Sequence, residues 1–199
     1  MILTEVAQVP DSALPLEAFK AHLRLGTGFG EDSLQDSVLN GFLRAAISAI
    51  EARTSKALLR RAFEWKLPRW RDPAAATLPV APVVAISSVV MEGGDGSETP
   101  VDPVLYYLEQ DAHHPKLRPV HGAMPMIANG GAAKITFEAG FGATWGDLPA
   151  DLAQAVLMLA AHYYEYREDT GLHGGCMPFG VTSLIERYRA TRLSLRAVQ

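Results

Sequence analysis

One histidine and nearby carboxylates have the residue types and spacing of a metal site: His162, Glu165 and either Glu168 or Asp169. Residues three or four positions apart lie on one face of a helix, so these groups can approach a single metal ion. A small metal-dependent hydrolase is therefore one hypothesis. No second histidine-rich helix supplies the remaining ligands, so a solvated polar edge of a helix is the favoured interpretation. Other histidines lie in segments rich in proline or glycine: His113, His114, His121 and His173.

Two further groups can be compared with known kinds of site. The glycines of Gly26–Gly30 could let backbone N–H groups approach a phosphate. A phosphate loop follows a strand and precedes a Lys-Ser/Thr pair, whereas here a helix is expected before the glycines. Asp95, Glu98 and Asp102 could serve as an acid/base group, yet carboxylates in turns mostly bond nearby backbone groups. We interpret the glycines as a loop between helices and the carboxylates as turn residues.

Aromatic and basic residues occur together around the middle of the chain: Trp65, Trp70 and Trp145, with Arg69 and Arg71. Such a set could stack on the bases of single-stranded nucleic acid, which is a second alternative function. The tryptophans flank both ends of a β-rich region, where large rings would wedge a sheet against helices. Packing in a core or an interface is therefore the favoured interpretation.

The sequence offers no anchor for nucleophilic or redox catalysis. It has no Gly-x-Ser-x-Gly turn, and its single cysteine, Cys176, has no second cysteine with which to form a disulfide or share a metal. We therefore predict no catalytic residue, no metal and no cofactor, in a protein that is not an enzyme.

Composition predicts one folded unit of ordinary size, since 48% of the 199 residues are hydrophobic and 20% are charged. We expect no signal peptide and no membrane-spanning segment, and hence synthesis in a cytosol-like compartment. The net charge is −4, but the residues from Gly180 onward carry +3, which leaves −7 on the rest. A basic end on an acidic body is typical of a docking segment, and the whole chain lacks the basic surface that drives DNA binding.

Helical spacing dominates the start of the chain. A first helix is predicted from about Leu16 to Leu25, behind Pro15. A second helix, capped by Ser33, carries two apolar columns and is expected to continue to about Ala62. Phe63–Leu67 then has the composition of a strand. The polar face of the second helix would meet solvent or a partner: Asp36, Asn40, Arg44 and Ser48.

Between Pro68 and Pro149, prolines, glycines and short β-branched runs replace the helical spacing. We expect a β-hairpin and one further half-buried strand there, because the runs alternate or are bounded by turn residues. The predicted elements are the strand Val83–Met91, the turn Gly93–Gly96, the returning strand Val104–Glu109 and the strand Lys134–Glu138.

Helical spacing returns behind Pro149, over about Asp151–Arg167. Apolar residues cover this helix almost all round, so either it is central or a neighbouring subunit covers it. A final helix is expected from near Ser183, where Glu186 could complete a capping box. The predicted fold class is α+β, with a helical core of two N-terminal and two C-terminal helices and an inserted small antiparallel β subdomain. The predicted boundaries are residues 1–62, 63–146 and 147–199.

A series of short motifs occurs in a characteristic order. The series comprises Leu-Glu-x-x-Lys-x-His-Leu-Arg (Leu16–Arg24), Ala-Ala-x-x-x-Ile-Glu-x-x-Thr (Ala45–Thr54), Pro82-Val83, Tyr106 or Tyr107, Phe-x-Ala-Gly-Phe-Gly (Phe137–Gly142), Leu-Pro-x-x-Leu-x-x-Ala (Leu148–Ala155), Tyr-x-x-Arg-Glu (Tyr164–Glu168) and Val-x-x-Leu-Ile-x-x-Tyr-Arg (Val181–Arg189). In order and spacing, the sequence resembles the phage head–tail connector family, including the adaptor proteins of phage-like gene transfer agents. The resemblance covers about Leu16 to Arg192.

The resemblance implies a structural adaptor that assembles in the bacterial cytoplasm and resides in the neck of a phage-like particle. Such adaptors form a ring, commonly of twelve subunits, between the portal and a tail-side stopper. DNA passes through the ring without sequence-specific binding, and no membrane is involved. Carried onto this sequence, the portal-docking residues would be Tyr188, Arg189, Arg192 and Arg196. The subunit contact would include Leu157, Met158 and Ala161.

Overall fold

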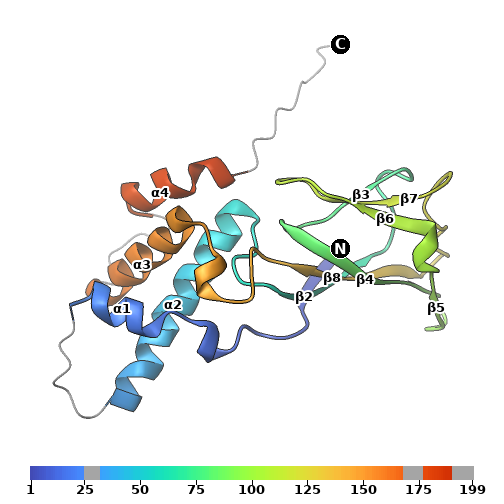
Figure 1. Ribbon diagram of the computed structural model, residues 1–199. Coiled ribbons are helices and arrows are strands. Elements are labelled where there is room, and N and C mark those ends of the chain that lie inside the picture. Colours follow the sequence, from blue (N-terminus) through green and yellow to red (C-terminus); the bar gives the residue numbers. More distant parts are fainter. Residues whose placement is uncertain (25–31, 168–176, 190–199) are drawn as a thin grey trace.

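The computed structural model describes residues 1–24, 32–167 and 177–189 and divides into a helical part and a β part (Figure 1). The helical part contains α1 (Leu16–His22), α2 (Asp32–Thr54), α3 (Ala150–Glu165) and α4 (Phe179–Ile185), with short 3-10 helices η1 (Asp11–Ala13), η3 (Trp145–Asp147) and η4 (Glu186–Tyr188). The β part contains β1 (Ile2–Glu5), β2 (Arg61–Leu67), β3 (Ala76–Thr77), β4 (Val83–Glu92), β5 (Glu98–Pro100), β6 (Tyr106–Glu109), β7 (Lys116–Pro119) and β8 (Ala132–Ala139), with η2 (Pro103–Leu105). The predicted α+β class, with four helices and antiparallel sheets, is confirmed. In the described ranges, no helix is both long and apolar enough to span a membrane.

Helix α3 lies at the centre of the helical part and contacts α1, α2 and α4. Its apolar residues point to all three neighbours, and Leu152, Ala155, Val156 and Leu159 are almost completely buried. The central position therefore accounts for much of its wide apolar surface, and cover by a neighbouring subunit stays a prediction. The long helix α2 packs beside it through Leu39, Leu43, Ala46 and Ile50, as the predicted apolar columns require.

Helix α2 ends at Thr54, and the prediction that it continues to about Ala62 is wrong. The Thr54 hydroxyl donates back to the Ile50 carbonyl (2.8 Å), and Ser55 has a φ of 55°, which no helix accommodates. The chain then extends, and β2 begins at Arg61 rather than at Phe63. The intervening residues Ala57–Leu59 are buried but not helical, so their hydrophobic side chains extend the apolar pattern of the helix beyond its end.

The five-stranded sheet has the order β1-β2-β8-β4-β5 and is antiparallel throughout. Strand β8 contains the predicted Lys134–Glu138 and lies at its centre, with Ile135 and Phe137 completely buried on one face. Phe137 stacks on its cross-strand partner Phe63, with ring centroids 5.7 Å apart. This face meets the second sheet, of order β3-β7-β6, and the two enclose a hydrophobic core separate from that of the helices (Figure 1).

The predicted hairpin exists, but its returning strand is β5 and not Val104–Glu109. The turn is tight, because Gly93 N–H donates to the Ser97 carbonyl (2.8 Å) and Gly96 adopts a φ of 82°. The chain therefore pairs with β4 from Glu98 onward. Asp102 then caps η2 through the Val104 N–H (3.0 Å), and the chain crosses to the second sheet, where β6 pairs with β7.

The last helix begins at Phe179 and not near Ser183. Pro178 is the residue before its first turn, where the missing N–H of proline costs nothing. Ser183 thus lies inside α4, so it does not form the predicted capping box with Glu186, and η4 extends the helix to Tyr188. The first helix runs from Leu16 to His22, slightly shorter than predicted. The predicted Gly26–Gly30 loop lies outside the described residues.

Candidate functional site

The residues of the hypothetical metal site do not form one in the described part of the chain. His162 is half-buried near the end of α3, and its ring packs against Tyr166 with centroids 4.7 Å apart. Glu165 is exposed, and Glu168 and Asp169 lie outside the described residues. Among residues 1–24, 32–167 and 177–189, no group of three histidine, cysteine or acidic side chains is placed to hold a metal ion. No structural observation therefore supports a hydrolase.

The turn carboxylates act locally, as predicted. Asp95 accepts hydrogen bonds from the Ser97 hydroxyl (2.6 Å) and N–H (3.0 Å), and these bonds lower the pKa of Asp95. Glu98 pairs with Lys134 across the sheet (2.5 Å), while Asp102 caps η2. The three carboxylates thus stabilise the turn and its neighbouring strands and are not arranged as an acid/base pair.

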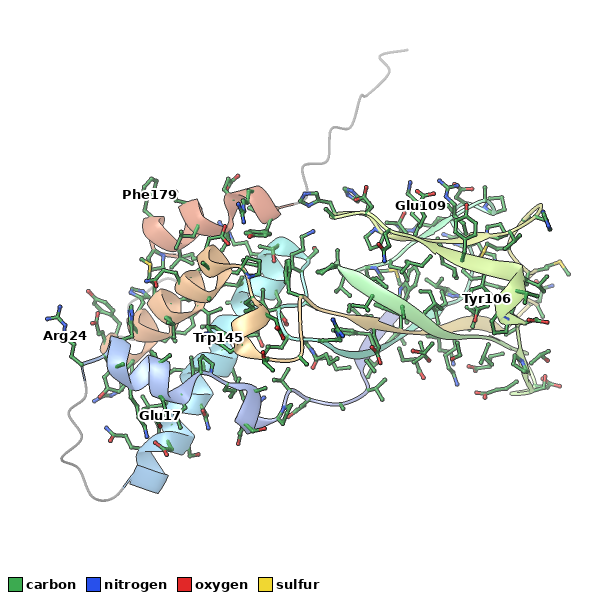
Figure 2. All side chains as sticks on the ribbon, in the orientation of Figure 1. Glu17, Arg24, Tyr106, Glu109, Trp145 and Phe179 are labelled. Carbon is green, nitrogen blue, oxygen red and sulfur yellow. The ribbon has the colours of Figure 1, made fainter. Side chains whose placement is uncertain are left out.

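The tryptophans serve mainly in packing. Trp65 is buried between the sheets, Trp145 packs against the helical core (Figure 2), and Trp70 donates its indole N–H to the Pro125 carbonyl (2.7 Å). Arg69 and Arg71 are exposed beside Trp70. Beside Trp70 lies an open groove of about 490 Å³, and among the described residues that line it Arg69 is the one with a charged side chain. Trp70 is half-buried and is the one aromatic side chain among the described residues that line this groove, whereas binding of single-stranded nucleic acid uses a series of stacking platforms.

The proposed docking segment begins beside a group of polar contacts that ties α3 to η4. The Tyr188 hydroxyl donates to Asp151 Oδ1 (2.7 Å), and Arg187 Nε lies 2.9 Å from the other carboxylate oxygen. The Tyr188 ring is buried and meets Phe141 edge-on, with centroids 6.1 Å apart. Burial raises the pKa of Tyr188, while the hydrogen bond from Arg187 opposes that rise. These contacts fix η4, the last described turn, against α3.

Substitution of Tyr188 by phenylalanine is expected to lower the free energy of unfolding by about 1 kcal/mol, because it removes a half-buried hydrogen bond to a carboxylate. Urea unfolding of the two proteins measures this difference. Tyr163 offers a matched control, because no hydrogen bond of its hydroxyl is present among the described residues and Tyr163→Phe should be neutral. Equal stability of the Tyr188→Phe and Tyr163→Phe proteins would contradict a stabilising role for the Tyr188 hydroxyl.

Of the predicted docking residues, two lie in the described part of the chain. The Tyr188 side chain is buried in the chain's own core, whereas Arg189 is exposed and pairs with Glu186 on η4 (3.0 Å). Arg192 and Arg196 lie outside the described residues. The role of these side chains in docking stays a prediction.

The residues predicted to contact a neighbouring subunit lie between the chain's own helices. Ala161 is buried, Leu157 and Met158 are half-buried, and all three belong to or pack against the helical core. Met158 is covered by α4, since a Cβ added to Gly180 would lie 2.8 Å from its terminal methyl group. A contact between these residues and a second subunit stays a prediction, but the apolar surface of α3 does not require one.

An ion-pair network that no sequence motif predicts joins α2 to the sheet. Arg61, on β2, is 8% exposed and pairs with Glu51 of α2 and Glu5 of β1, each at 2.7 Å. Glu51 also accepts the Leu58 N–H (2.7 Å), so one carboxylate holds both the turn after α2 and the start of β2. Burial alone would lower the pKa of Arg61, but these two carboxylates raise it, so the guanidinium stays charged.

A buried lysine forms a second connection at the same junction. Lys56 is 2% exposed, its ammonium group donates to the Ala112 carbonyl, and its Nζ lies 3.2 Å from His113 Nδ1. Burial lowers the pKa of His113, and the charge of Lys56 lowers it further. The loop between β6 and β7 is thereby attached to the end of α2.

The lowered pKa of His113 predicts a loss of stability in mild acid. Below about pH 6.5, His113 binds a proton more readily in the unfolded chain than in the folded protein. The stability that comes from the buried, neutral imidazole is therefore present above that pH and is lost as the pH falls. Urea unfolding at neutral and mildly acidic pH should show a larger loss for the wild-type protein than for His113→Asn. Equal losses of stability in the two proteins would show that His113 is not the group responsible for the pH dependence.

Solved structures similar to the whole chain come from the necks and virions of gene transfer agent particles. One, described as the "Neck of empty GTA particle computed with C6 symmetry", contains a chain 48% identical over 97% of both chains, with a TM-score of 0.89. A "Virion of native gene transfer agent (GTA) particle" matches at 48% identity and TM-score 0.85, and a "Neck of native GTA particle computed with C12 symmetry" at 44% and 0.84, each over 97% of both chains. No protein-family model matches the sequence, and no curated protein matches it.

These relatives share the whole fold and almost half of the residues, which is the level at which a common family is established. They are components of particle necks and virions, in agreement with the motif order of this sequence and with local, structural roles for its carboxylates and tryptophans. The chain therefore belongs to the head–tail connector (adaptor) family, as a structural protein of the gene-transfer-agent type and not an enzyme.

Proposed function

We propose that copies of this chain form a ring in the neck of a phage-like particle, between the portal on the head side and a stopper on the tail side. The observation that carries the proposal is the 44–48% identity, over 97% of the chain, to proteins in neck and virion structures of gene transfer agent particles. The C12 symmetry of one of these necks favours twelve copies in the ring. Assembly takes place in the bacterial cytoplasm, before the tail joins the head.

The charge distribution suits a ring around DNA. Outside the basic residues from Gly180 onward, the chain carries a net charge of −7. A wall of the same sign as the phosphate backbone does not hold DNA by counterion release, so DNA can slide through the channel without sequence-specific binding. The basic end is then free to dock on the portal.

Deletion of the gene from a particle-producing cell tests the function directly. We expect electron micrographs to show filled heads without tails, and expression of the chain from a plasmid to restore tailed particles. Image reconstruction of the restored particles should place the ring at the neck. Normal tailed particles in the absence of the chain would refute the proposal.

A further inference from the structure

The four edges of the two sheets differ in how well they are protected. In the described part of the chain, β1 and β5 form the edges of the larger sheet, and β3 and β6 those of the smaller one. Strand β3 has two residues, and β5 has Pro100, which lacks an N–H, and Glu98, which is held by Lys134. Short length, proline and charge are the usual means by which an edge avoids pairing with another chain.

The edge formed by β1 is less protected: it is short and ends in Glu5, but it has no proline and its other side chains include exposed apolar ones. All four residues of Ile2–Glu5 are exposed, and they include neither proline nor lysine. The Val6 N–H donates to the Ala62 carbonyl (2.9 Å), and the alternation of an antiparallel pair then directs the backbone groups of Leu3 and Glu5 away from β2. Ile2 is 62% and Val6 60% exposed, so this edge is both open and apolar.

The edge formed by β6 is similar. The Val120 N–H donates to the Leu105 carbonyl (2.9 Å), so the same alternation directs the backbone groups of Tyr106 and Leu108 away from β7. Within the described ranges, no strand pairs with that side of β6. Exposed apolar side chains surround it: Val104, Leu105, Tyr107 and Val120.

The two open edges lie on different sides of the β part. Strand β1 is beside β2, whereas β6 contacts β4, which is separated from β2 by β8. Figure 2 shows Tyr106 and Glu109 at the two ends of β6, which belongs to the smaller sheet. The carboxylates of both edges are already paired, Glu5 with Arg61 and Glu109 with Arg118. A strand added at either edge would therefore be held mainly by apolar contacts and backbone hydrogen bonds.

A closed ring of identical subunits requires two different, complementary surfaces on each subunit. We propose that β1 of one subunit pairs with β6 of the next, so that a continuous sheet crosses every subunit boundary of the ring. The occupant of each open edge is thus a second copy of this chain, which offers the same number of free backbone groups and the same apolar flanks. This inference rests on the proposed ring function.

Chemical cross-linking in assembled particles tests the pairing. In a Cys176→Ser background, Ile2→Cys and Tyr107→Cys together should give, with a short bismaleimide, a ladder of covalent multimers that extends beyond the dimer. The matched control pairs Ile2→Cys with Thr99→Cys on the protected edge β5, and it should give no ladder. Necks that contain the ring but yield no ladder from the first pair, or a ladder from both pairs, would overturn the proposal.

A proline at the open edge provides a second test. Leu3→Pro removes an N–H that points away from β2 and leaves the bonds between β1 and β2 in place. We expect an unchanged circular dichroism spectrum and a fall of about tenfold in ring assembly, the loss of ~1.4 kcal/mol per contact. The control is Glu98→Pro, whose N–H points outward from β5, and its assembly should be unchanged.

These experiments separate the two levels of inference. If the wild-type chain is absent from the neck, the ring function fails and the edge pairing fails with it. If wild-type and Leu3→Pro chains assemble equally well, the pairing of β1 with β6 is wrong while the ring function stands.

Discussion

Replacement of Glu51 by alanine is expected to lower the free energy of unfolding by about 3–5 kcal/mol, the usual cost of removing one partner from a buried ion pair. The carboxylate of Glu51 binds two nitrogens of Arg61 and the Leu58 N–H. Without it, a guanidinium that is 8% exposed keeps Glu5 as its only carboxylate partner among the described residues. A domain is commonly stable by about 5–15 kcal/mol, so this substitution removes a large share.

Two matched variants identify the cause of this loss. Glu5→Ala removes the partner that is 44% exposed, and it should cost about 1 kcal/mol or less. The double variant Glu51→Leu with Arg61→Met removes both charges, and it should be more stable than Glu51→Ala because no buried charge is left unpaired. Urea unfolding measures all three. Equal losses from Glu51→Ala and Glu5→Ala would show that the pair is not the connection described here.

Removal of the residues after Tyr188 is expected to abolish attachment to the portal while leaving the subunit folded. The deletion removes three arginines, Arg189, Arg192 and Arg196, and with them most of the positive charge of the C-terminal segment. Tyr188 itself stays, held by Asp151 and Phe141, so the last described turn keeps its contacts. Electron microscopy should then show heads without tails, and the purified portal should fail to retain the shortened chain.

Charge and length are separated by two further variants. Alanine at the three arginines keeps the length and removes the charge, and we expect it to weaken portal binding nearly as much as the deletion does. Arg69→Ala with Arg71→Ala removes exposed positive charge from the β part instead, and it should leave binding intact. Full binding by the deletion variant would show that docking lies elsewhere on the molecule.

Local patterns in the sequence predict much of the fold. Three local patterns each identify one element: the apolar columns of α2, the acidic residue and proline before α3, and the alternation around Ile135 and Phe137. In these elements, apolar side chains recur at the spacing at which the helix or strand turns them toward the core. The pattern fails where burial is continuous. Ala57–Leu59 are buried after the helix has ended, so hydrophobicity there does not distinguish helix from extended chain.

Long-range pairing is the part that the sequence does not specify locally. Two segments follow the turn after β4, namely Glu98–Pro100 and Tyr106–Glu109. Which of them pairs with β4 depends on the second sheet, which β6 joins. The Arg61 network likewise brings together Glu5, Glu51 and Arg61 from three elements. Glu51 belongs to the Ile-Glu-x-x-Thr motif, which marks the position but does not reveal its partner.

The shortness of β1 has a consequence for the free subunit. A four-residue strand offers only a few backbone hydrogen bonds, so a single contact between two copies is weak. Head-to-tail contacts that fail to close produce open filaments instead of rings. In the proposed ring, a weak contact would keep free subunits dispersed until the portal holds many copies at the closing angle, and it would limit polymerisation to the place where the subunits close into a circle.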